Sequence, residues 1–257
     1  MKSKIFITGA TGLLGKAMLE AMDRESFDIT IGQRQDPQIE HLSYKWTKFD
    51  LADTSLSLNL SGVDTIFHLA SSTRKPSYEL DVDGTESLLN NAKEYGVKHF
   101  IYISIVGIEK VPIKYYKIKK SAEEAIENSG VPYTILRATQ FHEFFEMIIK
   151  GLQRFPIVIL PGKAVLQPIE VNRVAQKLLE ISLQQPSNQI LEIGGQEKLT
   201  LKAAMNLWLK SKGVRKPILD IPMFLLGKIG RALKQGGLTT DECDGGSRRW
   251  GEWLEGK

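Results

Sequence analysis

The residues best suited to acid–base chemistry lie in one short segment, Tyr115-Tyr116-Lys117-Ile118-Lys119-Lys120. A free tyrosine hydroxyl titrates at about pH 10, and a lysine ammonium one helical turn away favours the tyrosinate and lowers that pKa. The segment offers two such pairs at i, i+4 spacing, Tyr115 with Lys119 and Tyr116 with Lys120. Helical phase selects the first pair, because Tyr115 and Lys119 fall within or beside the apolar stripe of the expected helix and the second pair points away.

Ser104 ends an expected strand eleven residues before Tyr115 and completes the candidate catalytic set. Its hydroxyl can hydrogen-bond the carbonyl or alcohol oxygen that reacts, while Tyr115 transfers the proton and Lys119 activates the tyrosine. The alternative for the pair is structural: Lys119 extends its ammonium past apolar neighbours to water, and Tyr115 lies at the rim. The combination with Ser104 and with the glycine-rich turn described next favours proton transfer.

A glycine-rich turn, Thr8-Gly9-Ala10-Thr11-Gly12-Leu13-Leu14-Gly15, follows the first expected strand and precedes an amphipathic helix. In a dinucleotide-binding unit, the first glycine allows the tight turn, the second lets a pyrophosphate approach the backbone and the third lets helix and strand pack closely. The phosphates then lie at the helix N-terminus, where unpaired N–H groups and the helix dipole favour negative charge. The sequence therefore predicts a nicotinamide dinucleotide site, with contacts from Gly9, Thr11, Gly12, Leu13, Leu14 and Gly15.

The end of the second expected strand indicates which nicotinamide cofactor binds. An acid there would bond the ribose hydroxyls of NAD, whereas here the strand leads into Gln33 and Arg34. The planar guanidinium of Arg34 suits a 2′-phosphate, so NADP is favoured; NAD is the alternative, with Arg34 then an ordinary surface residue. Further cofactor contacts are expected at the ends of the third and fourth strands and from the lysine of the catalytic set, at Asp50, Leu51, Leu69, Ala70, Ser71 and Lys119.

Short apolar runs alternate with helical patterns through the first half of the chain, which predicts a parallel sheet covered by helices on both faces. The expected strands there are Ile5–Thr8, Asp28–Gly32, Tyr44–Phe49, Val63–Ala70, His99–Ser104 and Tyr133–Leu136, with a helix over about 115–129. The second half is less regular, with expected helices Phe141–Gln153, Glu170–Gln184 and Leu201–Lys212, short strands within Ile157–Pro168, a strand Gln189–Ile193 and an amphipathic stretch from Phe224 to Leu233.

These patterns predict an α/β fold with a Rossmann-type, doubly wound parallel sheet and a small C-terminal α/β substrate lobe. We expect residues 1–155 to form the NAD(P)-binding domain and residues 156–257 the substrate lobe. The two are expected to interleave in part, because the strand Gln189–Ile193 can join the main sheet.

Composition limits the classes of protein that the chain can belong to. The 257 residues are 42% hydrophobic and 25% charged, which is typical of a soluble globular protein, and the mild net charge of +4 does not indicate nucleic-acid binding. A single cysteine, Cys243, excludes an intramolecular disulfide and a cysteine-rich zinc site, so no metal is expected. No apolar run is long enough for a signal peptide or a membrane span, which predicts a cytoplasmic location.

The motifs together resemble the short-chain dehydrogenase/reductase superfamily, and more narrowly its extended and atypical NmrA-like NAD(P)-binding branch, often labelled epimerase-like. The turn at Gly9 is similar to the superfamily's cofactor turn, and Ser104, Tyr115 and Lys119 match its catalytic set. The resemblance implies a substrate pocket beside the nicotinamide, lined by Thr139, Gln140, Phe141 and His142. A lone histidine at a helix start is more typical of packing than of proton transfer, so His142 is not expected to act as acid or base.

The resemblance implies an NADPH-dependent oxidoreductase that reduces a small carbonyl, quinone or related substrate by hydride transfer, with Tyr115 as proton donor. The first alternative is a non-catalytic NADP(H)-sensing NmrA-like regulator, and the second is an NAD-dependent epimerase or dehydratase. The retained tyrosine and lysine favour the enzyme, since a sensor has no need of an activated tyrosine. We expect a small-molecule substrate, a monomer or homodimer, and no nucleic-acid partner. Membrane association is not expected, because the stretch from Phe224 to Leu233 is more typical of core packing with a solvated basic face.

Overall fold

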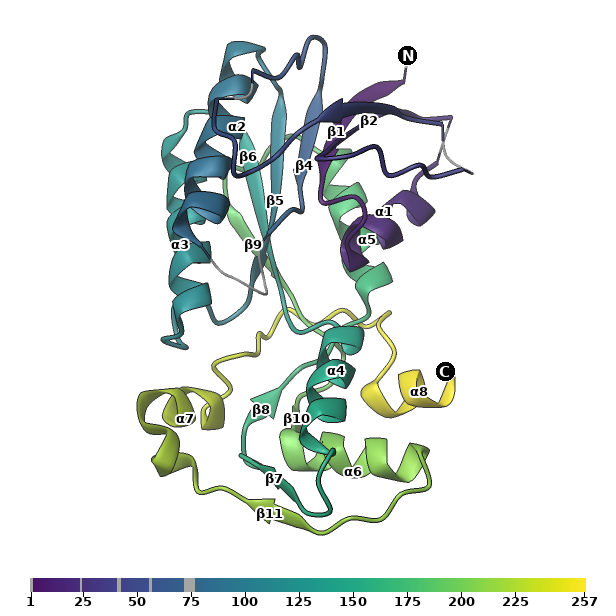
Figure 1. The fold of residues 1–257 in the computed structure, drawn as a ribbon, viewed down its shortest axis with the longest axis vertical. Coiled ribbons are helices and arrows are strands. Elements are labelled where there is room, and N and C mark those ends of the chain that lie inside the picture. The colour runs from purple at the N-terminus through teal and green to yellow at the C-terminus, as the bar shows by residue number, and fades with distance from the viewer. Residues whose placement is uncertain (1, 24, 41–42, 56, 72–76) are drawn as a thin grey trace. The chain divides into compact units, whose positions relative to one another are not determined.

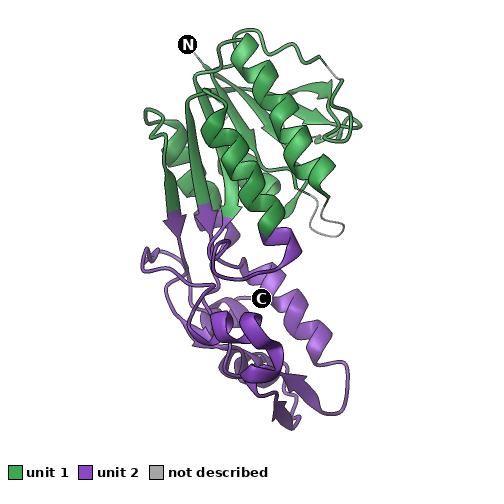
Figure 2. Ribbon diagram, turned by 90° about the vertical axis from the view of Figure 1, so that its left-hand side faces the viewer, with its two compact units in different colours: residues 1–104, 117–136, 174–191 green, residues 105–116, 137–173, 192–257 purple. Residues whose placement is uncertain are grey.

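The computed structural model describes residues 2–23, 25–40, 43–55, 57–71 and 77–257, and it divides into two compact units. Unit 1 comprises residues 1–104, 117–136 and 174–191, and unit 2 comprises residues 105–116, 137–173 and 192–257 (Figure 2). Residues 137–155 therefore group with unit 2 and residues 174–191 with unit 1, which is more interleaving than the single strand Gln189–Ile193 expected from the sequence. The chain crosses between the units several times, which no single boundary in the sequence can represent.

Unit 1 is built around a seven-stranded sheet of order β3-β2-β1-β4-β5-β6-β9. The registered pairs of β1 with β2 and β4, of β2 with β3 and of β4 with β5 are all parallel. The strands are β1 (Ser3–Thr8), β2 (Phe27–Gln33), β3 (Lys45–Lys48), β4 (Thr65–His68), β5 (His99–Ile105), β6 (Tyr133–Ala138) and β9 (Ile190–Ile193). This is the doubly wound Rossmann arrangement that the sequence predicts, and the late strand β9 joins the main sheet at its edge.

Helices cover both faces of this sheet (Figure 1). Helices α1 (Leu13–Ala21) and α5 (Val171–Ser182) lie on one face, and α2 (Gly84–Glu94), preceded by the π-helical turn η1 (Glu79–Asp83), lies with α3 (Lys114–Asn128) on the other. Apolar side chains such as Phe6, Ile66 and Phe100 form a buried cluster with residues of α2 and α3. Burial on both faces explains why the central strands β1 and β5 are largely apolar, whereas β2 alternates apolar and polar residues and the edge strand β3 is mostly exposed.

Unit 2 contains four helices and two small sheets within the described residues. Strand β7 (Val158–Leu160) pairs with β11 (Ile218–Asp220) in parallel, and β8 (Val165–Leu166) pairs with β10 (Leu199–Thr200) in antiparallel. The helices are α4 (His142–Leu152), α6 (Leu201–Ser211), α7 (Gly227–Lys234), which follows the 3₁₀ turn η2 (Met223–Leu226), and α8 (Trp250–Glu255).

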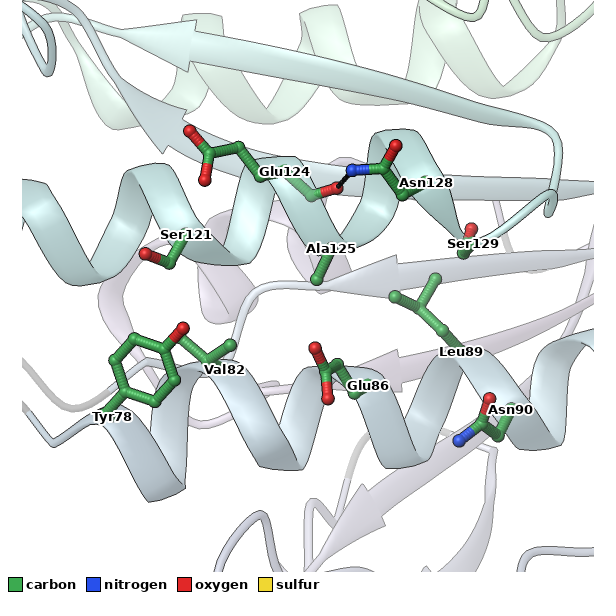
Figure 3. A pocket seen from close by; sticks show the side chains of 10 residues that line it. All are labelled: Tyr78, Val82, Glu86, Leu89, Asn90, Ser121, Glu124, Ala125, Asn128 and Ser129. Carbon is green, nitrogen blue, oxygen red and sulfur yellow. Dashed lines mark hydrogen bonds between the residues drawn. The ribbon is translucent and has the colours of Figure 1, made fainter.

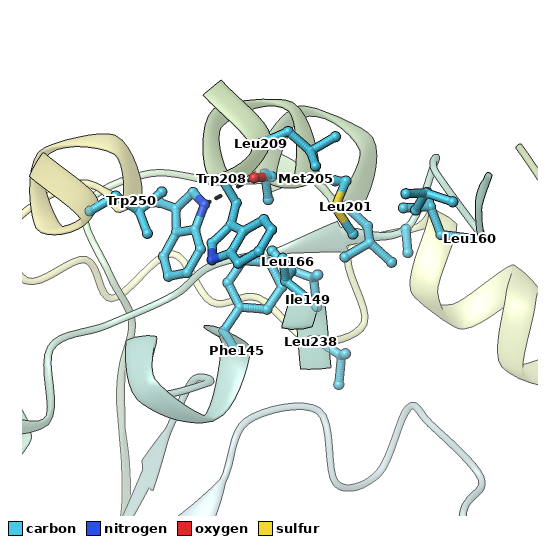
Figure 4. Close-up of a cluster of buried hydrophobic side chains, with 14 of the residues drawn as sticks. Phe145, Ile149, Leu160, Leu166, Leu201, Met205, Trp208, Leu209, Leu238 and Trp250 are labelled. Carbon is cyan, nitrogen blue, oxygen red and sulfur yellow. Dashed lines mark hydrogen bonds between the residues drawn. The ribbon is translucent and has the colours of Figure 1, made fainter. Parts of the chain in front are cut away.

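Large aromatic side chains fill the core of unit 2 (Figure 4). Phe145 of α4 packs on Trp250 of α8 with ring centroids 4.9 Å apart, and the indole N–H of Trp250 donates to the backbone oxygen of Ala204 at 3.1 Å. The C-terminal aromatic segment is therefore an integral part of this core. In the described ranges, no helix has both the length and the apolar character needed to cross a membrane.

Candidate functional site

The turn between β1 and α1 has the backbone geometry that its three glycines predict. Gly9 has a φ of +72°, and a Cβ at this position would lie 2.6 Å from the amide nitrogen of Ala70. A Cβ at Gly15 would lie 2.6 Å from the Cα of Ala10, so α1 packs directly on the turn. At Gly12 the nearest atom to such a Cβ is 3.2 Å away. Packing therefore requires glycine at 9 and 15, whereas the backbone at Gly12 stays open to a ligand.

Helix α1 begins without a side-chain cap. Gly12 is the N-cap residue, and in the part of the chain that the structure describes no side chain accepts a hydrogen bond from this end and the first turn has no acid. Thr11, Gly12 and Leu13 are exposed, whereas Leu14 is buried and packs in the core. Unpaired N–H groups and the positive end of the helix dipole form an anion site. These residues therefore fit the pyrophosphate of a nicotinamide dinucleotide.

A chain of hydrogen bonds through the buried His68 fixes the end of β4 beside the glycine turn. The hydroxyl of Thr85 donates to the backbone oxygen of Asp81 at 2.7 Å, so it accepts from Nε2–H of His68 at 3.0 Å. Nδ1 of His68 then accepts from the hydroxyl of Thr8 at 2.7 Å, and Thr8 Oγ1 accepts from the N–H of Ala70 at 3.3 Å. Burial lowers the pKa of His68 to about 3, which keeps the ring neutral in this network.

The end of β2 carries Gln33, which sequence reasoning did not identify as a site residue, next to the predicted Arg34. Nε2 of Gln33 donates to Oγ1 of Thr11 at 3.0 Å, and its backbone oxygen accepts from Nε1 of Trp46 and N of Phe49, each at 3.1 Å. Oε1 of Gln33 is buried without a hydrogen-bond partner among the described residues, and Arg34 is exposed. An unsatisfied amide oxygen beside the turn and an exposed guanidinium one residue later fit a ribose hydroxyl and a 2′-phosphate.

The remaining predicted cofactor contacts lie at the ends of β3 and β4. Oδ1 of Asp50 accepts from the backbone N–H two residues later at 3.1 Å, so this carboxylate stabilises its own turn. Leu51 packs against the core of unit 1. Leu69 is tied to β1 by its N–H, and Oγ of Ser71 donates to Oδ1 of the buried Asp81 at 2.7 Å. The end of β4 is therefore held beside the glycine turn, and the cofactor contacts of Asp50 and Leu51 stay predictions beside these local contacts.

Lys119 of α3 is a buried cation, only 2% exposed. Its Nζ donates to Oη of Tyr102 at 2.6 Å and to the backbone oxygen of Ile103 at 2.8 Å, and lies 3.9 Å from the centroid of the Tyr102 ring. Burial lowers the pKa of Lys119 to about 8, although the charges of Asp81 and Glu123 act in the opposite direction. A buried ammonium held in this way stabilises negative charge on a neighbouring oxygen, which an activated tyrosine requires.

Ser104 lies at the carboxyl end of β5, two residues after Tyr102 and so on the same face of the strand. It is buried, and its Oγ has no hydrogen-bond partner in the described parts of the chain. A buried hydroxyl without a partner costs free energy, and such groups are rare unless a ligand or a water satisfies them. Ser104 is therefore available to hydrogen-bond a substrate oxygen.

The two tyrosines of α3 differ from the predicted helical phase. Tyr115 is half-buried, one helical turn before Lys119, but Tyr116 is buried, not pointing away. Tyr116 belongs to the apolar cluster of unit 2, because α3 begins in that unit and continues in unit 1. Two cores, and not one stripe, thus decide which side chains are buried. Burial, assisted by Tyr115, raises the pKa of Tyr116 to about 12, which disfavours it as a proton donor.

The predicted substrate-pocket residues Thr139 to His142 all lie in unit 2, where β6 leads into α4. Oγ1 of Thr139 accepts from the N–H of Gly195 at 3.3 Å. Gln140 is bonded at both ends of its amide, donating to the backbone oxygen of Leu238 at 3.1 Å and accepting from the N–H of Gln167 at 3.2 Å. These contacts organise unit 2 internally and fix the orientation of the Gln140 amide.

His142 and Phe141 begin helix α4. Phe141 is the N-cap residue and is partly exposed, whereas His142 is fully buried. The imidazole packs on Trp253 and Trp250, with ring centroids 5.2 and 5.7 Å apart. Burial lowers the pKa of His142 to about 4, so it is neutral at physiological pH. Of the four predicted residues, Gln140 and Phe141 are partly exposed, whereas Thr139 and His142 are buried.

A polar groove of about 410 Å³ lies elsewhere on unit 1, between η1–α2 and α3 (Figure 3). It contains none of the predicted site residues and is lined by Tyr78, Val82, Glu86, Leu89, Asn90, Ser121, Glu124, Ala125, Asn128 and Ser129. The described residues contain no group of three or more histidine, cysteine or acidic side chains that could hold a metal ion. The candidate cofactor and catalytic residues therefore lie at the glycine turn and at the carboxyl ends of β1, β2, β4 and β5.

Tyr102, His68 and Gln33 are the site residues that sequence reasoning missed. A signal was present for each, because all three are polar or aromatic residues at or near the carboxyl end of an apolar parallel strand. In open α/β sheets ligands bind outside these strand ends, so polar residues there are expected to face a ligand or to position the groups that do. Only the structure shows which neighbours they bind.

Comparisons with known proteins agree with this geometry. The model of a family described as NAD(P)H-binding matches residues 9–146, which include the glycine turn, Ser104, Tyr115 and Lys119. Photosystem II assembly factor Ycf39 of Trieres chinensis is 23% identical over 235 residues, covering 86% of this chain and 73% of that protein. Divinyl chlorophyllide a 8-vinyl-reductase of Arabidopsis thaliana is 22% identical over 252 residues, covering 86% of this chain and 60% of that protein.

Solved structures share the fold over the whole chain. NADPH-dependent quinone oxidoreductase of Escherichia coli, complexed with NADPH, has a TM-score of 0.80 at 18% identity and covers 98% of this chain and 99% of its own. A nucleoside-diphosphate-sugar epimerase of Staphylococcus aureus also has a TM-score of 0.80, at 19% identity, with 99% and 100% covered. These structural likenesses establish a common fold, and the family model covers more than half of the sequence. The chain belongs to the NAD(P)H-binding family of Rossmann-type proteins.

Proposed function

We propose that this protein is an NADPH-preferring oxidoreductase that reduces a small carbonyl, quinone or related substrate. The observation that carries the proposal is the pair of buried polar groups at the carboxyl end of β5. The Ser104 hydroxyl has no hydrogen-bond partner among the described residues. The ammonium of Lys119 donates to the hydroxyl of Tyr102 and the backbone oxygen of Ile103, the two residues before Ser104 in the same strand. Burying a cation and an unsatisfied hydroxyl is costly for stability and is typical of catalytic sites.

Each residue of the set has a distinct role. Nicotinamide, when bound, supplies the hydride from its C4 position. Ser104 hydrogen-bonds the substrate oxygen, Tyr115 donates the proton to that oxygen, and the charge of Lys119 stabilises the tyrosinate that remains. The turn from Gly9 to Gly15 binds the pyrophosphate through backbone N–H groups.

The preference for NADPH rests on Arg34. Its exposed guanidinium follows β2, and no acid stands at this strand end to repel a 2′-phosphate. The NADPH complex of the structurally similar quinone oxidoreductase supports the same choice. Gln33 is an amide, which can bond a ribose hydroxyl as well as a phosphate, so some affinity for NADH is expected. Arg34→Gln should weaken NADPH binding about tenfold and leave NADH binding unchanged.

The decisive experiment combines turnover with cofactor binding in Tyr115→Phe. We expect this variant to lose reduction of quinones and carbonyls but to keep the thermal shift given by NADPH. That shift is large enough to measure, because a ligand at 100 times its dissociation constant adds about 2.7 kcal/mol to the free energy of unfolding. Turnover that survives in Tyr115→Phe would show that another group donates the proton. Lys117→Met, an exposed residue of the same helix, is the control and should behave like the parent protein in both assays.

A second candidate is a regulator that binds NADP(H) without catalysis. The similarity to Ycf39, whose name describes an assembly factor, favours this candidate. A thermal shift with NADPH, together with no oxidation of NADPH by a panel of quinones and carbonyls, would support it over the oxidoreductase. An NAD-dependent epimerase or dehydratase is a third candidate, which equal shifts with NAD⁺ and NADP⁺ would favour.

A further inference from the structure

The most basic part of the molecule is one region of unit 2, made of residues 147–163 and 209–236. These segments contain ten lysines and arginines and a single acid, Asp220, whereas the rest of the chain has 24 basic and 29 acidic residues. Asp220 is used internally, because its Oδ1 accepts from the N–H of Gly162 at 2.7 Å. Lys150 pairs with Glu146, just outside these segments, at 3.1 Å. The net charge of +4 for the whole chain thus conceals an excess of positive charge in these segments.

The same region exposes large apolar side chains. In η2, Met223 is buried in the core of unit 2, which leaves its neighbours Phe224 and Leu225 78% and 64% exposed. The β7–β11 sheet contributes Ile159 and Leu219, which are register partners and are both exposed. The sequence expectation that Phe224 would pack on the core is therefore wrong for this residue, because Met223 takes the buried position.

Helix α7 places basic residues next to these apolar side chains. Lys228, Arg231 and Lys234 recur at i, i+3 spacing and are exposed, while Ile229 and Leu233 pack against the core of unit 2. Within the described residues none of these three cations forms an ion pair, so their charges face solvent uncompensated. The apolar face of α7 therefore packs on the core as predicted. Its opposite, basic face is exposed and continues from the exposed Phe224 and Leu225 of η2.

We propose that this region, named here the basic–apolar edge and comprising η2, α7 and the β7–β11 sheet, docks on a membrane surface that contains anionic lipids. Phe224 and Leu225 enter the boundary between headgroups and acyl chains, and Lys228, Arg231 and Lys234 contact lipid phosphates. Charge complementarity selects this occupant. A second copy docked through this same edge would bring two basic surfaces together, and a nucleic acid would leave Ile159, Leu219 and Leu225 without an apolar partner.

Flotation of the 257-residue chain with vesicles tests the proposal. We expect the protein to float with vesicles of phosphatidylcholine containing about a third phosphatidylglycerol, and not with phosphatidylcholine alone. The double substitution Phe224→Ser with Leu225→Ser should lower the partition constant at least ~10-fold. Lys228→Gln with Arg231→Gln should lower it roughly 30-fold, since each basic residue near such a surface contributes about fivefold. All four side chains are exposed, so circular dichroism should show unchanged folding.

Leu183→Ser is the matched control, because Leu183 is 77% exposed but lies in unit 1, away from the basic segments in the sequence. This variant should float like the parent protein. The proposal is overturned if the parent fails to float, or if the Phe224/Leu225 double variant floats as well as the parent. Binding to a single-stranded oligonucleotide or formation of a dimer, without binding to vesicles, would also overturn it and assign the edge to that partner. None of these measurements depends on the proposed reductase activity.

Discussion

Replacing Lys119 by methionine should change how the stability of the protein depends on pH. Lys119 is 2% exposed, and burial lowers its pKa from 10.5 to about 8. Between these values the unfolded chain keeps the proton on Lys119 and the folded chain has lost it. Since the unfolded state then binds more protons, the free energy of unfolding rises with pH in this window. The cost of burying the ammonium is fully present below pH 8 and is relieved as the pH approaches 10.5.

The size of the effect follows from the shift in pKa. A lowering from 10.5 to about 8 corresponds to roughly 3 kcal/mol at 1.36 kcal/mol per unit. The parent protein should therefore gain ~3 kcal/mol relative to Lys119→Met between pH 8 and 10.5, whichever of the two is more stable at neutral pH. Methionine is chosen because it keeps most of the side-chain volume and cannot be charged.

Urea denaturation of both proteins at several pH values measures this gain. Taking the difference between the proteins at each pH removes the contribution of other groups, including Tyr116, whose pKa burial raises to about 12. Lys117→Met is the control for removing a lysine from the same helix, because Lys117 is exposed. A difference between parent and Lys119→Met that stays constant over this range would refute the inference that Lys119 is a desolvated cation.

Three further predictions concern the network around the site and the core of unit 2. Tyr102→Phe removes an acceptor 2.6 Å from Nζ of Lys119, so the stability gain in the same pH assay should begin below pH 8; an unchanged onset would show that the hydroxyl does not hold the ammonium. Gly9→Ala should abolish NADPH binding and destabilise the chain more than Gly96→Ala, because both glycines have positive φ but only at position 9 would the Cβ meet the backbone, 2.6 Å from an amide nitrogen. Equal losses of stability in urea would contradict that steric argument. His142→Phe should resist acid better than the parent: burial lowers the pKa of His142 from 6.5 to about 4, so the unfolded state takes up the proton first and the parent loses about 3 kcal/mol relative to the variant as the pH falls through this range. Equal acid sensitivity of the two proteins in circular dichroism would refute it.

The sequence was sufficient to predict the architecture of the sheet because the signals are local. The strands over residues 3–8 and 99–105 are largely apolar, the strand over 27–33 alternates apolar and polar residues, and each is found within two residues of its predicted ends. The short elements β10, β11 and α8 were not predicted. Two to six residues cannot display a period, so only pairing and packing with distant segments define these elements.

The glycine turn, and the position of Lys119 within or beside an apolar stripe, were already legible in the sequence. Both depend on chemistry within a few residues: a backbone that needs glycine at 9 and 15, and an i, i+4 relation to an apolar stripe. The tertiary structure decided which atoms these groups meet. Lys119 binds Tyr102, which is 17 residues earlier in the chain, and Tyr116 is buried because α3 serves two cores. Such contacts depend on how sheet and helices pack, and the spacing of residues along one element carries no information about the neighbour that another element brings.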